Sequence, residues 1–134
     1  MTLFTPMLRA SSLTEIFSDE STLQGMLDFE AALARATALC GVTPESAIKM
    51  ISAQCQVTKL DIPALAQAAA SAGNLAIPLV KQLTANVKQQ DEQAARYVHW
   101  GATSQDVIDT GLILQLRDAL KASETLLELS LIHI

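Results

Sequence analysis

The sequence is poor in aromatic residues and in cysteine. Aromatic side chains make up 4% of the 134 residues, whereas 50% of the residues are hydrophobic. The core therefore has to form mainly from small aliphatic contacts between helices, and we expect an all-α fold. Cys40 and Cys55 have neither the paired spacing of metal ligands nor a histidine nearby in the sequence. We interpret them as reduced, buried structural thiols and predict no metal site.

Clusters of basic residues and long apolar runs are also missing. The net charge is -5, and no group of lysines and arginines offers a local surface for phosphates, which argues against nucleic-acid binding. No stretch reaches the roughly 18 apolar residues that a membrane span needs. The amino terminus does not have the pattern of a secretory signal peptide either. We therefore expect a cytoplasmic protein that binds neither nucleic acid nor membranes.

Helix signals recur along most of the chain. Residues 1–11 lack periodicity and contain Pro6, so they predict an extended arm, followed by a helical turn at 12–17. Ser18 before two acidic residues predicts the start of a helix over 19–40, and Gly41 predicts its end. Three more helices are predicted by similar signals: from Thr43-Pro44-Glu45 to near Gln56, from Asp61 to Gly73-Asn74, and one with Pro78 in its first turn.

A long helix is predicted after Asp106, because leucine and isoleucine recur there at helical spacing. We expect residues 1–101 to form a small helical domain and residues 102–134 to begin a helical bundle. Apolar residues crowd the last nine positions without a capping glycine or a polar stop. This pattern indicates a helix that is cut off before the segments that would cover it.

The segment 99–110, with the sequence HWGATSQDVIDT, is where polar groups gather beside a flexible glycine. The hydroxyls of Thr103 and Ser104, together with backbone N–H groups that the helix leaves free, can hold a carboxylate at a helix amino terminus. The alternative is that Thr103 or Ser104 only caps the helix and that Asp106 is only a favourable first-turn charge. The local pattern does not decide between the two.

Two further polar residues have similarly open roles. His99 can donate a hydrogen bond to an anion or move a proton, but it can equally be a packed or capping residue beside Trp100. Asn74 either belongs to a plain helix end or sits on a turn that directs its amide into a cleft. The charges of Asp91, Glu92 and Arg96 are most simply explained as a solvated face.

The segment 99–110 resembles the first signature of the fumarase/aspartase superfamily, in the form H-x-G-x-T-S-x-D-x-x-x-T. The flanking segments 73–81 (GNLAIPLVK) and 114–120 (LQLRDAL) are similar to the carboxymuconate cycloisomerase branch, and Ile16–Asp19 also fits the superfamily. Adenylosuccinate lyases share the signature. They usually carry an Arg-Tyr pair in the amino-terminal arm, where this chain has Met7-Leu8.

The resemblance implies a cofactor-free, intramolecular lactonisation of a carboxymuconate, a small polycarboxylate of aromatic catabolism. It implies a homotetramer whose active sites combine three subunits around a central bundle, and a chain that starts the first long helix of that bundle. The family's second and third signatures are not found in the 134 residues. We therefore expect no catalytic residue here and an inactive isolated chain.

By the same resemblance, substrate binding is assigned to residues spread over two segments: His99, Thr103, Ser104, Asp106 and Asn74. The rival interpretations are an elimination like that of adenylosuccinate lyases and a nonenzymatic helical assembly module.

Overall fold

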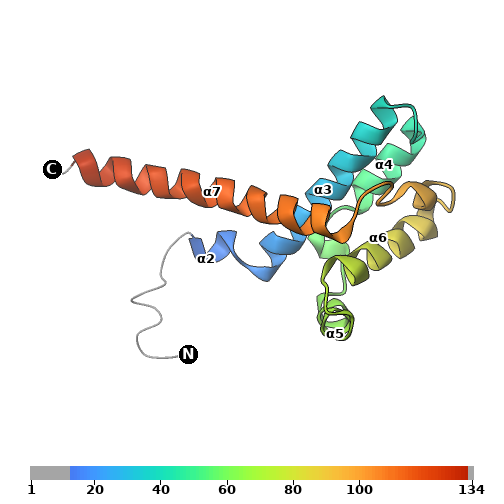
Figure 1. Cartoon of the computed structure of the whole chain (residues 1–134), viewed down its shortest axis with the longest axis horizontal. Helices are drawn as coiled ribbons and strands as arrows, with labels where there is room; N and C mark the ends of the chain where they lie inside the picture. The colour runs from blue at the N-terminus through green and yellow to red at the C-terminus, as the bar shows by residue number, and fades with distance from the viewer. Residues whose placement is uncertain (1–12, 133–134) are drawn as a thin grey trace.

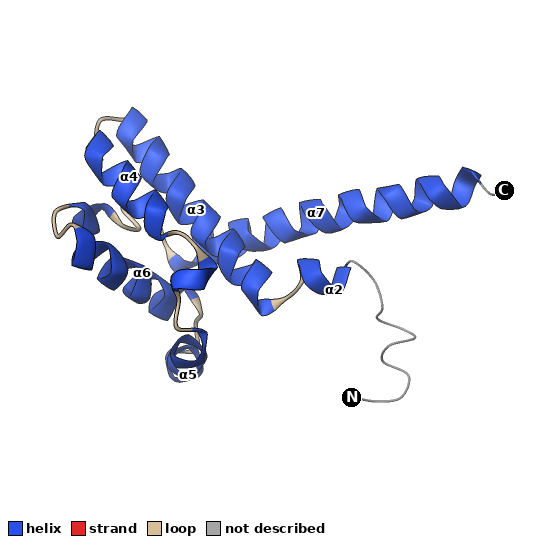
Figure 2. Cartoon of the chain, turned by 180° about the vertical axis from the view of Figure 1, so that it is seen from behind, coloured by secondary structure: helices blue, strands red, loops and turns tan. Residues whose placement is uncertain are grey.

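The computed structural model describes residues 13–132, and all of its regular elements are helices (Figure 1 and Figure 2). The α-helices are α2 (Leu13–Ile16), α3 (Asp19–Leu39), α4 (Glu45–Gln54), α5 (Ile62–Ala72), α6 (Ala76–Gln90) and α7 (Ser104–Ile132), and two 3-10 turns are η1 (Val57–Lys59) and η2 (Ala94–Tyr97). The predicted arm at 1–11, including Met7 and Leu8, lies outside the described residues. No helix within 13–132 combines the length and the apolar character that crossing a membrane requires.

Most helix ends follow the local signals in the sequence. The hydroxyl of Ser18 accepts a hydrogen bond from the Ser21 N–H at 3.2 Å and starts α3. The Asp61 carboxylate accepts one from the Ala64 N–H at 3.0 Å and starts α5. Gly73 ends α5 in the left-handed conformation, with φ of 64°. These predicted boundaries are confirmed.

The predicted cap at Thr43 is wrong. Pro44 holds the N-cap position of α4 in an extended conformation, with ψ of 143°, and no side chain caps that helix. The Thr43 hydroxyl instead lies 2.7 Å from the hydroxyl of Thr37 and is buried against the end of α3. The turn between α3 and α4 is thus closed by a hydrogen bond between a residue of α3 and a residue of the turn itself.

Two more side chains differ from their predicted environments. Cys55 is buried as expected, but Cys40 is exposed, because it follows the last residue of α3 at the tip of the α3–α4 turn. Asp91 is half-buried and accepts hydrogen bonds from the N–H groups of Gln93 and Ala94, so it caps η2. Glu92 and Arg96 are exposed, as predicted.

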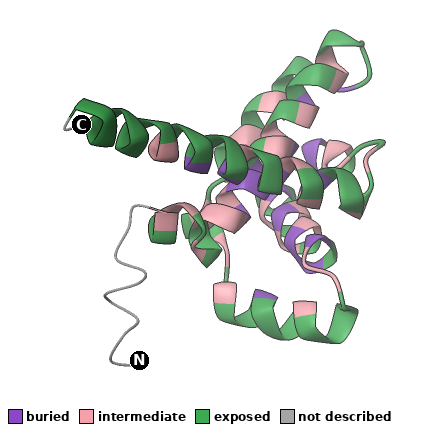
Figure 3. Cartoon of the chain, turned by 60° about the vertical axis from the view of Figure 1, so that its left-hand side comes forward, coloured by how far each residue is buried: buried purple, intermediate pink, exposed green. Residues whose placement is uncertain are grey.

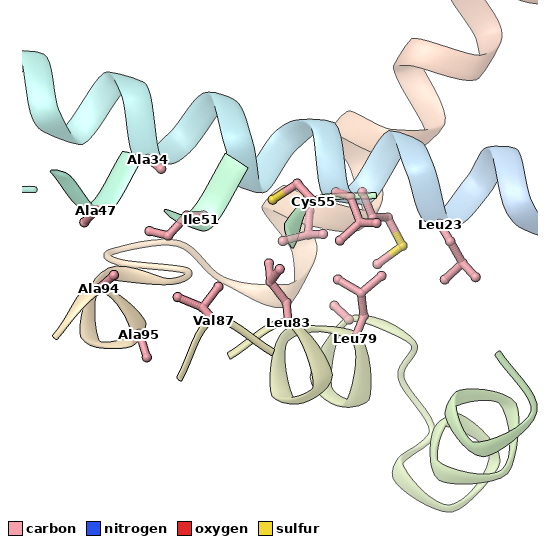
Figure 4. Packing of buried hydrophobic residues seen from close by; sticks show 14 of the residues in the cluster. Leu23, Ala34, Ala47, Ile51, Cys55, Leu79, Leu83, Val87, Ala94 and Ala95 are labelled. Carbon is pink, nitrogen blue, oxygen red and sulfur yellow. The ribbon is translucent and has the colours of Figure 1, made fainter. Parts of the chain in front are cut away.

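The core lies where α3, α4 and α6 face one another (Figure 4). The predicted apolar side of α6 supplies Leu79, Leu83 and Val87, each 0% exposed, and α4 supplies Ile51. Figure 4 shows these side chains directed from α6 and α4 toward α3. Because the packed residues are leucine, isoleucine, valine and alanine, the low aromatic content is no obstacle to a dense interior.

Helix α7 crosses α3 near its beginning and then extends away from the other helices (Figure 1). The crossing is close because glycine faces glycine: a Cβ at Gly25 would lie 3.2 Å from the Gly111 carbonyl oxygen. Gln115, one turn further along, donates hydrogen bonds to the Ile16 carbonyl at 2.8 Å and to the Thr22 hydroxyl at 3.0 Å. The first half of α7 is therefore fixed to α2 and α3.

The second half of α7 extends beyond these contacts with α2 and α3. Its surface is exposed almost all round in Figure 3, and the exposed residues include Leu120, Leu126, Leu127, Leu129, Leu131 and Ile132. The expectation of exposed apolar area on this helix is confirmed.

Candidate functional site at the start of helix α7

The polar segment forms a tight turn that leads from η2 into α7. Gly101 has φ of 74°, and His99, which has a Cβ, also adopts a positive φ of 57°. Trp100 between them is half exposed, and its ring centroid lies 6.1 Å from that of Tyr97. The segment thus reverses the chain direction within a few residues and places polar side chains at the amino terminus of α7.

Thr103 and Asp106 form a local cap. One oxygen of the Asp106 carboxylate accepts a hydrogen bond from the Thr103 N–H at 2.7 Å and another from the Thr103 hydroxyl at 3.0 Å. Both bonds lower the pKa of the exposed Asp106 carboxyl below its ordinary value, and the bond from the backbone N–H has the larger effect. The Thr103 N–H is thus engaged by the chain's own carboxylate, and a substrate contact of Thr103 stays a prediction.

Ser104 differs from its neighbour. It is the first residue of α7, it is half-buried, and no acceptor or donor among residues 13–132 engages its hydroxyl. The hydroxyl can therefore turn toward an incoming anion without breaking an internal bond. It sits at the positive end of a 29-residue helix, where negative charge is favoured.

His99 is paired with a buried carboxylate. Its Nδ1 lies 2.6 Å from Oε1 of Glu30, a residue of α3 that is 1% exposed. Burial raises the pKa of the Glu30 carboxyl, while the hydrogen bond and the charge of His99 act in the opposite direction. The pair joins the polar segment to the core of the molecule.

Sequence reasoning missed Glu30, although one signal was present. Glu30 lies at helical spacing from Met26, Leu27 and Ala34 and so interrupts the apolar face of α3 with a carboxylate. An acidic side chain in such a position needs a partner, because an unpaired buried charge is costly. The partner is 69 positions away in the sequence and cannot be identified from spacing.

Asn74 has a capping role in this structure. Its Oδ1 accepts hydrogen bonds from the N–H groups of Ala76 at 2.8 Å and Ile77 at 3.3 Å, at the beginning of α6. Across the described part of the chain, no hydrogen bond links Asn74 to residues 99–106. The structure brings Thr103, Ser104 and Asp106 together, whereas a substrate contact of Asn74 stays a prediction.

The main concavities lie away from this segment. A groove of about 650 Å³ at the crossing of α3 and α7 is lined partly by Arg35 and Arg117, and a second one of about 910 Å³ follows the outer half of α7. Neither is lined by a residue assigned to substrate binding. Between residues 13 and 132, no three His, Cys, Asp or Glu side chains are grouped so that they can hold a metal ion. Both grooves therefore lie apart from the residues at the start of α7.

Known proteins resemble this chain over nearly its whole length. The profile of a family described as lyase matches residues 7–131. The 3-carboxy-cis,cis-muconate cycloisomerase of Bradyrhizobium diazoefficiens is 59% identical over 120 residues, which are 90% of this chain and 27% of that protein. The cycloisomerase of Pseudomonas putida is 57% identical over 122 residues, which are 91% and 29%.

The folds agree as well. The crystal structure of 3-carboxy-cis,cis-muconate lactonizing enzyme from Pseudomonas putida superposes with a TM-score of 0.89 at 57% identity, covering 92% of this chain and 28% of that one. The chain thus spans between a quarter and a third of the length of these relatives. The all-α fold expected from composition is confirmed.

Proposed function

Since the chain belongs to the lyase family, we propose that it provides the first substrate-binding segment of a 3-carboxy-cis,cis-muconate cycloisomerase. In this reaction, a carboxylate oxygen of the substrate forms a bond to a carbon of a double bond in the same molecule, and the neighbouring carbon takes up a proton. The product is a carboxymuconolactone. No electrons are exchanged with another reactant, so positioning and proton delivery account for the catalysis, and no cofactor is required.

The observation that carries the proposal is the identity of 54–59% with four cycloisomerases over about 90% of the chain. The geometry at the start of α7 supports it chemically. A tricarboxylate substrate needs hydrogen-bond donors near a favourable electrostatic potential, and the unengaged Ser104 hydroxyl lies at such a helix terminus. The overall charge of -5 does not prevent this, because the attraction is local.

In this proposal Ser104 and His99 contact the substrate, and Thr103 and Asp106 hold the turn that presents Ser104. Asn74 orders the start of α6, and its amide nitrogen remains available to a ligand. Residues 1–101 act as the helical amino-terminal domain, and residues 102–134 begin a bundle that is completed by other segments. We place the whole enzyme in the cytoplasm as a homotetramer of the protocatechuate branch of the β-ketoadipate pathway. No observation favours elimination on a nucleotide or a nonenzymatic assembly role.

The proposal can be tested with a chimera in which this chain replaces the matched segment of the Pseudomonas putida cycloisomerase. We expect the chimera to consume 3-carboxy-cis,cis-muconate in an ultraviolet assay and the isolated chain to be inactive. Turnover by the isolated chain that Ser104→Ala abolishes would contradict the second expectation. A folded chimera, assembled like the parent enzyme but without turnover, would refute the proposed function.

The role of Ser104 is tested in the same chimera. A lost charge-assisted hydrogen bond costs about 1.5–3 kcal/mol, so Ser104→Ala should lower kcat/KM by roughly 10- to 150-fold. The stability should change little, because Thr103 and Asp106 make the cap. Ser123→Ala is the matched control: it removes a serine of the same helix whose hydroxyl only bonds the Ala119 carbonyl, and it should leave kcat/KM unchanged. An unchanged kcat/KM with a large loss of stability in Ser104→Ala would indicate that this residue only caps the helix.

A further inference from the structure

We propose that Glu30 is a positioning residue for His99: its buried carboxylate accepts the Nδ1–H of the imidazole and so reserves Nε2 for the substrate. The inference rests on the proposed function only where it assigns His99 to the substrate. The pairing itself is a property of the 134-residue chain.

The first support is the contrast in burial within the pair. The Glu30 side chain is 0% exposed, whereas that of His99 is 19% exposed. The two ring nitrogens lie on opposite sides of an imidazole, so with Nδ1 turned to the inner carboxylate, Nε2 is the nitrogen left for the outer side. A histidine in this state presents the same nitrogen to every ligand.

The second support is that, among the described residues, the Glu30 carboxylate has no hydrogen-bond partner other than His99. Glu30 Oε2 is buried without a hydrogen-bond partner in the described part of the chain, and Oε1 is bonded to His99. A carboxylate in the core opposes folding unless it is paired, and an apolar side chain of similar size would fill the same space on α3. The bond to His99 is the contact that compensates the burial of Glu30.

The third support is the backbone of His99. A residue with a Cβ rarely adopts φ of 57°, and such a conformation persists only where the surroundings hold it in place. The bond to Glu30 anchors the ring from α3, and the turn at Gly101 follows directly. The ring is thus fixed to α3 before any substrate arrives, which is the condition for a defined contact.

The charge of the pair sets the chemistry of Nε2. A ring with a proton on both nitrogens donates Nδ1–H to Glu30 and presents Nε2–H on its other side. This Nε2–H can donate to a substrate carboxylate. Two other ionisable groups lie within electrostatic reach of the pair: Cys55, whose thiol pKa is raised by burial first and by the Glu30 charge second, and Asp106, whose pKa is lowered mainly by its hydrogen bonds from Thr103.

The test is nitrogen NMR of the imidazole in the 134-residue chain. The chain has two histidines, so His133→Gln leaves the signals of His99 alone. We expect Nδ1 to be protonated at neutral pH, with a proton resonance shifted downfield by the bond to Glu30. Glu30→Leu, an apolar replacement of similar size, should remove the proton from Nδ1 and leave the neutral Nε2–H ring that free histidine favours. An unprotonated Nδ1 in the unsubstituted chain overturns the inference without any variant, as does an unchanged tautomer in a folded Glu30→Leu.

The consequence for reaction is measured in the chimera. Glu30→Leu should lower kcat/KM at least tenfold, and Glu30→Gln, which keeps an oxygen acceptor for Nδ1–H, should restore part of it. A changed tautomer with unchanged kcat/KM in Glu30→Leu would refute the positioning role. A parent chimera without turnover, combined with the expected NMR result, would instead refute the proposed function and leave the Glu30–His99 pairing established.

Discussion

The outer half of α7 should drive self-association of the chain, and charged substitutions on it should reverse the effect. Along this helix a groove of about 910 Å³ is bordered by the apolar side chains of Ile113, Leu116, Leu120, Leu127 and Leu131. Leu120, Leu127 and Leu131 are 71%, 65% and 68% exposed. A surface of this kind marks a site where another helix packs.

The free energy of association can be worked out from these exposed fractions. Complete burial of a leucine stabilises by about 1.5–3 kcal/mol, so each of the three exposed leucines retains about 1–2 kcal/mol to be gained on association. Burying these three leucines on each of two copies gives about 6–12 kcal/mol, against about 4–15 kcal/mol lost in translational, rotational and side-chain freedom. Because the two terms are of similar size, we expect association that depends on the protein concentration. Leu120→Lys removes about 1–2 kcal/mol per copy, which weakens a dimer by roughly 30- to 700-fold.

Sedimentation velocity over a series of concentrations measures this directly. The unsubstituted chain should shift toward larger species as concentration rises, and a chain with Leu116→Lys and Leu120→Lys should stay closer to monomer. Leu39→Lys is the matched control, since Leu39 is 91% exposed at the end of α3, away from the groove, and its replacement should not change association. A sharp monomer peak at high concentration, with no binding of a hydrophobic dye, would show that the helix covers its own apolar face and would refute the reasoning.

Other consequences of the structure are testable in the isolated chain. Gly111→Ala should lower the free energy of unfolding by about 1 kcal/mol in urea titrations, because a Cβ would lie 3.1–3.2 Å from atoms of Met26 and the overpacking outweighs the gain in helix propensity; a rise in stability would contradict the close crossing. A thiol reagent at pH 8 should label Cys40 quickly and Cys55 only after denaturation, because burial raises the pKa of the Cys55 thiol to about 12; equal labelling rates would disprove this. Since burial raises the Glu30 pKa above 4.5, its carboxyl contributes stability that is fully present below pH 4.5 and is lost as the pH rises through the folded pKa. The stability of the chain relative to Glu30→Gln should therefore fall as the pH rises above 4.5 in denaturation midpoints, and a rise would contradict a raised pKa of Glu30.

The sequence by itself determined the helices and the place of the polar segment. Capping depends on a side chain and N–H groups two or three residues away, so Ser18 and Asp61 could be identified locally. The left-handed end at Gly73 depends on a single residue type. The hydroxyls and the carboxylate of the segment 99–110 lie close together in the sequence itself. The start of α7 could therefore be predicted as a candidate site before any fold was known.

Only the tertiary structure decided which groups of that segment are free and which are engaged. The capping bond between Asp106 and Thr103 spans three residues and is local, but the half-buried position of the open Ser104 hydroxyl depends on how the turn packs. His99 meets Glu30 across 69 positions, and the leucines of α7 face outward because Gly111 permits a closer approach to α3 than any leucine would. The sequence shows which face of a helix is the most apolar. It does not show which face packs, because that depends on how well the shape of the face fits the neighbouring helix.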